Sequence, residues 1–328
     1  MSHFPVLSSI LSDNKLGEFM AAKYGLNGPF ECDLFRTGVN HTYFFHNSKS
    51  KYIVRVYSHS WRTKIEIEEE LKLLQFLKEN NLPVSYPILD KQNKMIHEIN
   101  APEGLRYIVL FSFAEGKKMR FLNIEMCFKI GSIIANLHKT TVNKTINRIT
   151  YDSEILLNRS YNKLKHFFSE DLLEMKYLKK LGIEISKRFE NVNQTEFQQG
   201  IVHLDIWYDN FSVNSNDEIT IFDFDNCGNG LLIYDIGYFC MQLFFIESDK
   251  KIYESKIETF FKGYSNIRNL TQNEIRLIPE AGASIYIFYL GVQAQRFDWS
   301  NIFLTENYLK MMIERIKLWL EYHNFNNK

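Results

Sequence analysis

The chain has 328 residues, more than one small module needs, which suggests about two domains or one large two-lobed domain. Its apolar content of 45% and charged content of 24% exclude a disordered chain, which lacks the apolar surface to offset its ordering entropy. Lys plus Arg and Asp plus Glu both number 39, so the basic excess typical of a general nucleic-acid binder is absent.

The first third of the chain predicts a sheet with one long helix inserted after the third strand. A short helix is predicted over residues 15–24, and the long helix, over residues 65–80, carries Leu73, Leu74 and Leu77 at helical spacing. Runs rich in β-branched and aromatic residues predict the strands, over residues 31–35, 42–46, 52–57, 88–89, 95–98 and 106–113.

The rest of the chain is predicted to be mostly helical. Short strands over residues 201–204 and 218–224 interrupt it. Helices are predicted over residues 125–138, 153–168, 172–191, 234–247, 251–264, 272–296 and 305–322. We therefore expect an α+β, two-lobed chain, with an N-terminal lobe over residues 1–112 and a C-terminal lobe over residues 113–328.

No stretch of the sequence approaches the roughly 18 apolar residues of a membrane-spanning helix, and the N-terminus lacks the pattern of a signal peptide. The cysteines form no C-x-x-C pair, so neither a zinc knuckle nor a redox pair is indicated; they are Cys32, Cys127, Cys227 and Cys240. We expect a reduced, soluble, cytoplasmic protein, a monomer or homodimer that binds neither membranes nor nucleic acid.

The most informative segment runs from residue 201 to residue 237. One loop in it carries Asp205 and Asn210, and a second carries Asp223 and Asp225. A polar turn lies between the loops, so the flanking strands can pair as a hairpin and bring these side chains to one end of a small sheet. Asp and Asn oxygens are hard ligands suited to Mg²⁺, and an Asp not used by a metal can orient or deprotonate a hydroxyl.

The spacing of these residues is that of a kinase active site. Asp205, four intervening residues and Asn210, then Asp223-Phe224 after a strand, match a catalytic Asp, a metal-binding Asn and a metal-binding Asp. Each residue alone is weak evidence, because Asp and Asn are common in turns. The set in this order and context indicates phosphoryl transfer.

These motifs resemble those of the aminoglycoside phosphotransferase and choline kinase superfamily, which has a protein-kinase-like fold. The likeness is closest to its bacterial stress-response kinase and homoserine kinase-like branch. It includes the segment from Gly228 to Gly237, the loop at Gly38 and the strand 52–57, and it extends from about residue 20 to residue 240. The last part of the chain is similar only in being helical.

The resemblance implies a role for each motif residue in the C-terminal lobe. Asp205 would accept or orient the acceptor hydroxyl, and Asn210 and Asp223 would hold Mg²⁺ with help from Asp225. His203 would be structural, bonding backbone near the Asp223 loop. Asp235 would brace the catalytic loop rather than contact substrate.

The resemblance also implies an ATP site in the N-terminal lobe. Arg55 stands where a protein kinase has a phosphate-binding Lys, with Lys51 on the same strand face as the fallback. Glu70 is its expected ion-pair partner, with Glu66 as the alternative. Backbone around Gly38 and Asn40 would cover the phosphates, although the Gly-rich loop of kinases is absent. The adenine would lie near residues 111–116, between the lobes; the residues expected around it are Ile53, Phe111, Phe113 and Phe222.

We expect the acceptor to be a hydroxyl of a small molecule, such as an antibiotic, an amino alcohol or a sugar. Trp207, Tyr208 and Trp299 are candidates to line its pocket, where they could stack on a ring or attract an amine by cation–π interaction. Most other aromatic residues of this lobe, including Tyr286 and Tyr289, are expected to pack in its core.

Other functions remain open at this point. Relatives of the family also phosphorylate protein Ser or Thr. The Arg at position 55 and the missing Gly-rich loop are compatible with a non-catalytic, nucleotide-binding pseudokinase. The D-x-D at residues 223–225 after an apolar strand also fits a haloacid-dehalogenase-type phosphatase, and more weakly a glycosyltransferase.

Overall fold

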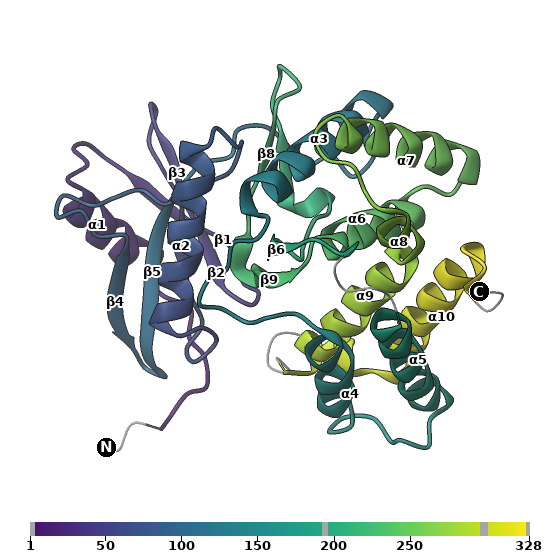
Figure 1. Cartoon of the computed structure of the whole chain (residues 1–328). Coiled ribbons are helices and arrows are strands. Elements are labelled where there is room, and N and C mark those ends of the chain that lie inside the picture. Colours follow the sequence, from purple (N-terminus) through teal and green to yellow (C-terminus); the bar gives the residue numbers. More distant parts are fainter. Residues whose placement is uncertain (1–3, 192–195, 296–300, 326–328) are drawn as a thin grey trace. The chain divides into compact units, whose positions relative to one another are not determined.

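The structure is a computed structural model and describes residues 4–191, 196–295 and 301–325. The chain divides into two compact units, Met1–Glu115 with Thr220–Phe222 and Gly116–Ile219 with Asp223–Lys328. The predicted α+β fold class is confirmed (Figure 1). The predicted division after residue 112, and the roles given to the two parts, stay predictions.

The first unit is built on an antiparallel five-stranded sheet in the order β1-β2-β3-β5-β4. The helix α1 packs on one face, where Leu16 and Met20 join Tyr43, Phe45 and Val54 in an apolar core. The elements of this unit are α1 (Asp13–Tyr24), β1 (Glu31–Arg36), β2 (His41–His46), β3 (Lys51–Val56), α2 (Lys64–Glu79), β4 (Ile96–Ala101) and β5 (Gly104–Ser112).

The helix α2 begins at a capping box. The Thr63 hydroxyl accepts from the backbone N–H of Glu66, and the Glu66 carboxylate accepts from the backbone N–H of Thr63. This satisfies two of the backbone N–H groups that a helix start leaves unpaired. Glu66 is therefore occupied at the helix start, which leaves Glu70, one turn further along, as the acid that can face the sheet.

The predicted strand over residues 88–89 is wrong. The segment before β4 runs beside β5 with single backbone bonds, such as Ile88 N–H to Leu110 O at 2.8 Å, and forms only isolated bridges. Pro83 and Pro87 lack the N–H groups that a continuous ladder needs. The same segment holds Thr220–Phe222 in the first unit, since Ser85 N–H donates to Ile221 O at 2.9 Å.

The second unit is a group of helices with two small sheets. Helices α3 and α7 pack together, as do α6 and α9 (Figure 1). Strand β6 pairs with β9, and β7 pairs with β8 as a hairpin. The elements are α3 (Ile124–Thr141), α4 (Arg159–Leu164), α5 (Leu173–Glu190), β6 (Gln199–Val202), β7 (Phe211–Val213), β8 (Ile219–Ile221), β9 (Gly228–Leu231), α6 (Ile233–Ile246), α7 (Lys250–Ser265), α8 (Gln272–Arg276), α9 (Ile278–Gln295) and α10 (Glu306–Tyr322).

Two predicted helices are interrupted in the structure. The helix predicted over residues 153–168 is a π-helical turn, Glu154–Asn158, followed by the short α4. The helix predicted over residues 272–296 is broken at Leu277, whose backbone leaves the helical region just before Pro279. Pro279 has no N–H to donate to the carbonyl four residues earlier, so the hydrogen bonds of α8 cannot continue through it, and a proline fits the first turn of a new helix.

Helices α6 and α9 approach each other closely at a pair of glycines. A Cβ atom built on Gly237 would lie 2.5 Å from the backbone nitrogen of Gly282, and one built on Gly282 would lie 2.6 Å from the carbonyl oxygen of Gly237. Any larger residue at either position would have to move the helices apart. The glycines therefore set the separation of α6 and α9.

The four cysteines are buried and free, as the sequence pattern indicates. Among the described residues, no helix has the length and apolar character that crossing a membrane requires.

Candidate active site

Asp205 lies on the loop that follows β6, and its side chain is half-buried. The residue before it, Leu204, has a φ of +68°, in the left-handed region that non-glycine residues rarely adopt. Both N–H groups before Asp205 are held by one carboxylate: His203 N–H and Leu204 N–H donate to Asp235 at 2.9 and 2.6 Å. Asp235 therefore stabilises the unusual backbone that presents Asp205.

Asp235 belongs to the first turn of α6 and is fully buried. Its third donor is His138 of α3, whose Nε2 lies 3.1 Å from Oδ2. The other ring nitrogen of His138 lies 2.7 Å from the Tyr264 hydroxyl, which also accepts from Arg268 at 2.8 Å. With its proton on Nε2, His138 donates to Asp235 and accepts the Tyr264 hydroxyl proton at Nδ1, so every group in this chain of hydrogen bonds has a partner. Burial lowers the pKa of His138.

His203 is fully buried beside the loop. Its Nδ1 accepts the backbone N–H of Asp205 at 3.1 Å, and its ring packs against Phe224 at 4.3 Å between centroids. The imidazole thus links the Asp205 loop to the residue that follows Asp223. This is a supporting contact and leaves His203 Nδ1 with no proton to transfer.

Asn210 lies in a short 3₁₀ turn, Tyr208–Asn210, and is buried. Its Nδ2 donates to the Asp205 carboxylate at 2.8 Å and to the Asp205 carbonyl at 3.0 Å. The amide is therefore oriented with its nitrogen toward Asp205. The side-chain oxygen remains as a hard, neutral ligand atom.

The second loop begins at Asp223, which also has left-handed backbone, with φ +67°. It continues as a 3₁₀ turn, Phe224–Asn226, in which Asp225 is buried. Arg148 donates to the Asp225 carbonyl, and the Tyr151 hydroxyl donates to the Asn226 carbonyl at 2.7 Å. The loop is thus fixed from outside by side chains that the sequence patterns do not point to.

The carboxylates of Asp205 and Asp223 interact electrostatically. Burial, and then the negative charge of Asp223, raise the pKa of Asp205 to about 7. Hydrogen bonds from Tyr289, Asn210 and Tyr238 act in the opposite direction. Two carboxylates and an amide oxygen are the donor set that Mg²⁺ takes in phosphoryl-transfer sites, so the residues present fit a divalent cation.

Tyr238 and Tyr289 are site residues that the sequence interpretation missed. Tyr289 was expected to pack in the core, and Tyr238 was not singled out. The two rings stack at 5.4 Å, and the Tyr289 hydroxyl donates to the carbonyl of Leu204, the residue before Asp205, at 3.3 Å. No local pattern in the sequence marks these two tyrosines, because they lie on helices α6 and α9, well after the Asp205 loop in the chain.

The candidate nucleotide residues lie in the first unit. The predicted ion pair forms there: Arg55 on β3 bonds the fully buried Glu70 of α2 at 2.9 Å. The Tyr57 hydroxyl donates to the other carboxylate oxygen of Glu70 at 3.1 Å, and the Arg55 guanidinium lies 5.0 Å from the centre of the Phe111 ring. Lys51, the fallback, is exposed, with its ammonium 5.5 Å from the Phe113 ring.

The other residues expected at the nucleotide lie on the same unit. The loop with Gly38 is tied down by Asn40, whose Oδ1 accepts from the backbone N–H of Ser58 at 3.3 Å. Ile53 pairs with Phe111 across β3 and β5, on the face away from the α1 core. Phe222 belongs to the segment that joins the first unit. Their role in binding a nucleotide stays a prediction.

Of the aromatic residues expected around the acceptor, two are described. Trp207 and Tyr208 are half-buried and meet edge to face, with ring centres 4.9 Å apart. Asp209, next to them, pairs with Lys118 at 2.8 Å. Trp299 lies outside the described residues.

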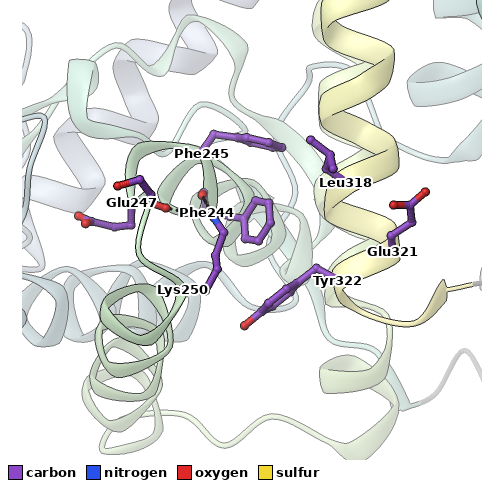
Figure 2. A pocket seen from close by; sticks show the side chains of 8 residues that line it. Phe244, Phe245, Glu247, Lys250, Leu318, Glu321 and Tyr322 are labelled. Carbon is purple, nitrogen blue, oxygen red and sulfur yellow. Dashed lines mark hydrogen bonds between the residues drawn. The ribbon is translucent and has the colours of Figure 1, made fainter.

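Two further surface features lie away from these groups. An open pocket of about 440 Å³ lies between the end of α6 and α10, lined by Phe244, Phe245, Lys250 and Tyr322 among others (Figure 2). It includes none of the predicted site residues. On β1 and β2, Glu31, Asp33 and His46 lie close together, but these groups are largely exposed and His46 already pairs with Asp33.

Comparisons with known proteins show which family the chain belongs to. The model of the phosphotransferase enzyme family matches residues 33–270. A homoserine kinase of Bradyrhizobium diazoefficiens is 23% identical over 296 residues, covering 90% of this chain and 85% of its own.

Solved structures show the same fold. A microcompartment-associated aminopropanol kinase superposes with a TM-score of 0.76 at 20% identity, over 95% of this chain and 97% of its own. An amicoumacin kinase in complex with AMP-PNP, Ca²⁺ and Ami has a TM-score of 0.77 at 20% identity, over 95% and 94%. The antiparallel sheet and this family match do not support the haloacid-dehalogenase alternative. The chain therefore belongs to the phosphotransferase enzyme family and is a phosphotransferase with an alcohol group as its acceptor.

Proposed function

We propose that the protein transfers the γ-phosphate of ATP, in the presence of Mg²⁺, to a hydroxyl of a small amino alcohol or a related small molecule. The observation that carries this proposal is the Asp205 loop. A carboxylate is held beside an amide ligand and near a second carboxylate, on backbone that two N–H bonds to Asp235 stabilise.

In this proposal Asp205 accepts the proton of the acceptor hydroxyl. As the proton leaves, the hydroxyl oxygen bonds to the γ-phosphorus, and the bond from that phosphorus to the oxygen shared with the β-phosphate breaks, which releases ADP. The ionised form of Asp205 is the one that can accept the proton, and the donors from Asn210 and the tyrosines favour that form.

Asn210, Asp223 and Asp225 would hold the metal. A bound divalent cation supplies positive charge that orients the phosphates and offsets the charge that develops during transfer. These residues come from the two loops that Asp235, Arg148 and Tyr151 fix in place.

Arg55 would bind the nucleotide phosphates. Its guanidinium is oriented by a hydrogen bond to the buried Glu70, and a guanidinium can bind phosphate oxygens bidentately. This geometry is the reason an Arg could replace the Lys of protein kinases at this position.

The relatives guide the choice of acceptor. They include a homoserine kinase and an aminopropanol kinase, and the compound in each name carries both a hydroxyl and an amine. Trp207 and Tyr208, close in sequence to Asp205, could attract such an amine by cation–π interaction. The balanced charge of the chain gives no reason to favour a polycationic antibiotic.

An acceptor screen tests this function. ADP release is measured by a coupled assay with Mg-ATP and, in turn, homoserine, aminopropanol, other amino alcohols, sugars and an aminoglycoside. We expect one small alcohol to raise ADP release well above the rate without acceptor. Asp205→Ala should lower that rate by a thousandfold or so, which corresponds to roughly 4 kcal/mol of transition-state stabilisation.

Nucleotide binding provides a second readout. Mg-ATP should raise the Tm of the wild-type protein, and EDTA should remove most of that shift if the metal links nucleotide and protein. A protein that shows neither acceptor-dependent ADP release nor a Tm shift with Mg-ATP would refute the proposal. Binding of Mg-ATP without turnover of any acceptor, including a protein substrate mixture, would favour the pseudokinase.

A further inference from the structure

We propose that Tyr264 and Arg268 are positioning residues, which act on the catalytic loop through the carboxylate of Asp235. The inference rests on the proposed function, because it assigns these residues a task in presenting Asp205. Both lie well beyond the motifs in the sequence, Tyr264 near the end of α7 and Arg268 in the segment before α8.

The Asp205 loop depends on the direction in which the Asp235 carboxylate points. That carboxylate accepts from the backbone N–H groups of His203 and Leu204 at 2.9 and 2.6 Å. Leu204 has a φ of +68°, an unfavourable conformation for a residue with a side chain, so it needs these bonds to persist. A carboxylate that turned about its own side-chain bonds would release both N–H groups and free the loop.

The His138 ring limits that rotation. Its Nε2 lies 3.1 Å from Asp235 Oδ2, but a ring held at one nitrogen could flip and turn a C–H toward the carboxylate. The Tyr264 hydroxyl lies 2.7 Å from the other nitrogen, Nδ1. Burial lowers the pKa of His138, so the ring is neutral at pH 7 and Nδ1 accepts the hydroxyl proton. Two hydrogen bonds on different sides of the ring therefore fix its orientation.

Arg268 fixes the direction of this chain of hydrogen bonds. A guanidinium can only donate, and Arg268 Nη1 donates to the Tyr264 oxygen at 2.8 Å. The hydroxyl proton is then directed to His138, and the proton on His138 Nε2 is directed to Asp235. An ionised carboxylate can only accept, so both ends of the chain require the same direction. The protons between Arg268 and Asp235 thus have a single arrangement.

The Arg268 side chain is itself held in place. It is buried, and its other nitrogens donate to Glu274 at 2.5 Å and to Gln198 at 2.6 Å. Glu274 is fully buried and belongs to the capping box of α8, and Gln198 directly precedes β6. Because β6 leads into the Asp205 loop, Arg268 holds the start of this strand directly and the loop at its end through Tyr264.

Removal of one hydroxyl tests the inference by turnover. Tyr264→Phe keeps the buried ring but leaves Nδ1 of His138 without its donor. Tyr253→Phe is the matched control, because its ring is also buried on α7 and contacts the rings of Phe244 and Tyr322. We expect Tyr264→Phe to lower kcat about tenfold with the KM of ATP within about twofold of the wild type, and Tyr253→Phe to leave kcat within about twofold.

A second variant tests whether Arg268 acts through Tyr264. Arg268→Lys keeps a positive charge beside Glu274, but a single ammonium group cannot reproduce the three directions of the guanidinium. We expect kcat to fall about threefold in the wild type and by less in the Tyr264→Phe background, because the two residues act along one chain of hydrogen bonds. Equal fold-losses in both backgrounds would overturn the role given to Arg268.

Hydrogen exchange of the nucleotide-free protein separates this inference from the proposed function. Mass spectrometry follows the amides of His203 and Leu204 in a peptide that spans residues 201–206. Tyr264→Phe should speed their exchange about tenfold, while peptides from the five-stranded sheet exchange as in the wild type.

Three results would overturn the inference: wild-type kcat in Tyr264→Phe, unchanged exchange at His203 and Leu204, or faster exchange in every peptide, which indicates a general loss of stability. A change confined to the KM of the acceptor would also overturn it and assign the Tyr264 hydroxyl to acceptor binding. Failure of the acceptor screen together with the expected change in exchange would refute only the proposed function.

Discussion

At the scale of single residues, the buried carboxylate of Asp205 lies near that of Asp223, an arrangement that suits phosphoryl transfer but lowers the stability of the fold. The folded protein raises the pKa of Asp205 above its ordinary value of 3.8, so ionising Asp205 weakens the fold at neutral and higher pH. Asp205→Asn should therefore raise the unfolding free energy of the metal-free protein at pH 8 by about 1–2 kcal/mol while it abolishes turnover.

Chemical denaturation at two pH values checks this prediction. At pH 5 the folded protein holds Asp205 mostly protonated, so the gain of Asp205→Asn over the wild type should shrink. A variant that is no more stable than the wild type at pH 8 would contradict the electrostatic interpretation of the site.

The ion pair of Arg55 and Glu70 allows a second prediction. Arg55→Met leaves the fully buried Glu70 carboxylate without its charged partner, so we expect a loss of about 3 kcal/mol in unfolding free energy. The double variant Arg55→Met/Glu70→Met should recover most of this loss, because no buried charge remains.

Urea denaturation measures the cycle, and Lys51→Met is the control on the same strand face. Lys51 is exposed, so its replacement should change the unfolding free energy by less than about 0.5 kcal/mol. Equal stability of Arg55→Met and the double variant would show that Glu70 takes up a proton instead.

Local spacing is what made single residues predictable. Asp205, Asn210 and Asp223 stand in an order that phosphoryl transfer requires, and Glu70 follows from the helical repeat of α2. Arg148, Tyr238 and Tyr289 could not be found this way. They reach the loops through tertiary packing between distant helices, and nothing in their own neighbourhood in the sequence marks them.

At the scale of elements, His138 joins three helices. It lies on α3 and bonds Asp235 of α6 and Tyr264 of α7, with Arg268 and Glu274 as the nearby charged groups. Burial lowers its pKa in the folded protein, so the unfolded chain takes up a proton more readily below about pH 6.5. Stability is therefore complete above that pH and is lost as the pH falls.

His138→Gln tests this element contact by its pH dependence. The wild-type unfolding free energy should fall between pH 7 and pH 5, and His138→Gln, though less stable at pH 7, should show a shallower fall. His97, the other buried histidine with a lowered pKa, provides a comparison in the first unit. An unchanged slope in His138→Gln would assign the acid sensitivity to other groups.

The glycines between α6 and α9 give a prediction about helix spacing. Gly237→Ala places a methyl group against backbone of α9, so we expect a loss of about 2–3 kcal/mol and a lower kcat, since Tyr238 and Tyr289 depend on the same spacing. Gly182→Ala on α5 is the control. Its nearest neighbour is a Leu157 side chain at an ordinary 3.7 Å, so alanine should be neutral or stabilising there.

Thermal unfolding and turnover of the two Gly→Ala variants give the comparison. If Gly237→Ala is as stable as the wild type, the helices separate without strain and the spacing argument fails. A stable Gly237→Ala with low kcat would instead locate the effect in the tyrosine pair.

Element types were predictable wherever one residue pattern ran unbroken. The strands β1, β2 and β3 and the helices α2 and α7 follow their hydrophobic repeats closely. Two of the errors lie where prolines interrupt the pattern, at Pro83 and Pro87 before β4 and at Pro279 in the first turn of α9. The strand β9 was missed because its Gly-Asn-Gly sequence has little strand propensity and depends on pairing with β6.

At the scale of the whole molecule, the four buried thiols can report unfolding. Burial raises the pKa of Cys32 and of Cys127 to about 12, and that of Cys240 higher still. A thiol reagent needs access and the thiolate form, so we expect no reaction in the native protein within minutes and four reactive thiols in urea. One thiol that reacts fully before unfolding would contradict the buried assignment.

The return of the chain to the first unit has a consequence for protein synthesis. Residues 83 and 85 hydrogen-bond Ile221, so the first unit contains a piece made long after its sheet has been translated. While the ribosome is still making the helices in between, the Pro83 carbonyl and the Ser85 N–H lack their partner in Ile221. A nascent chain released before Phe222 should therefore be a better target for chaperones and proteases than one released just after it.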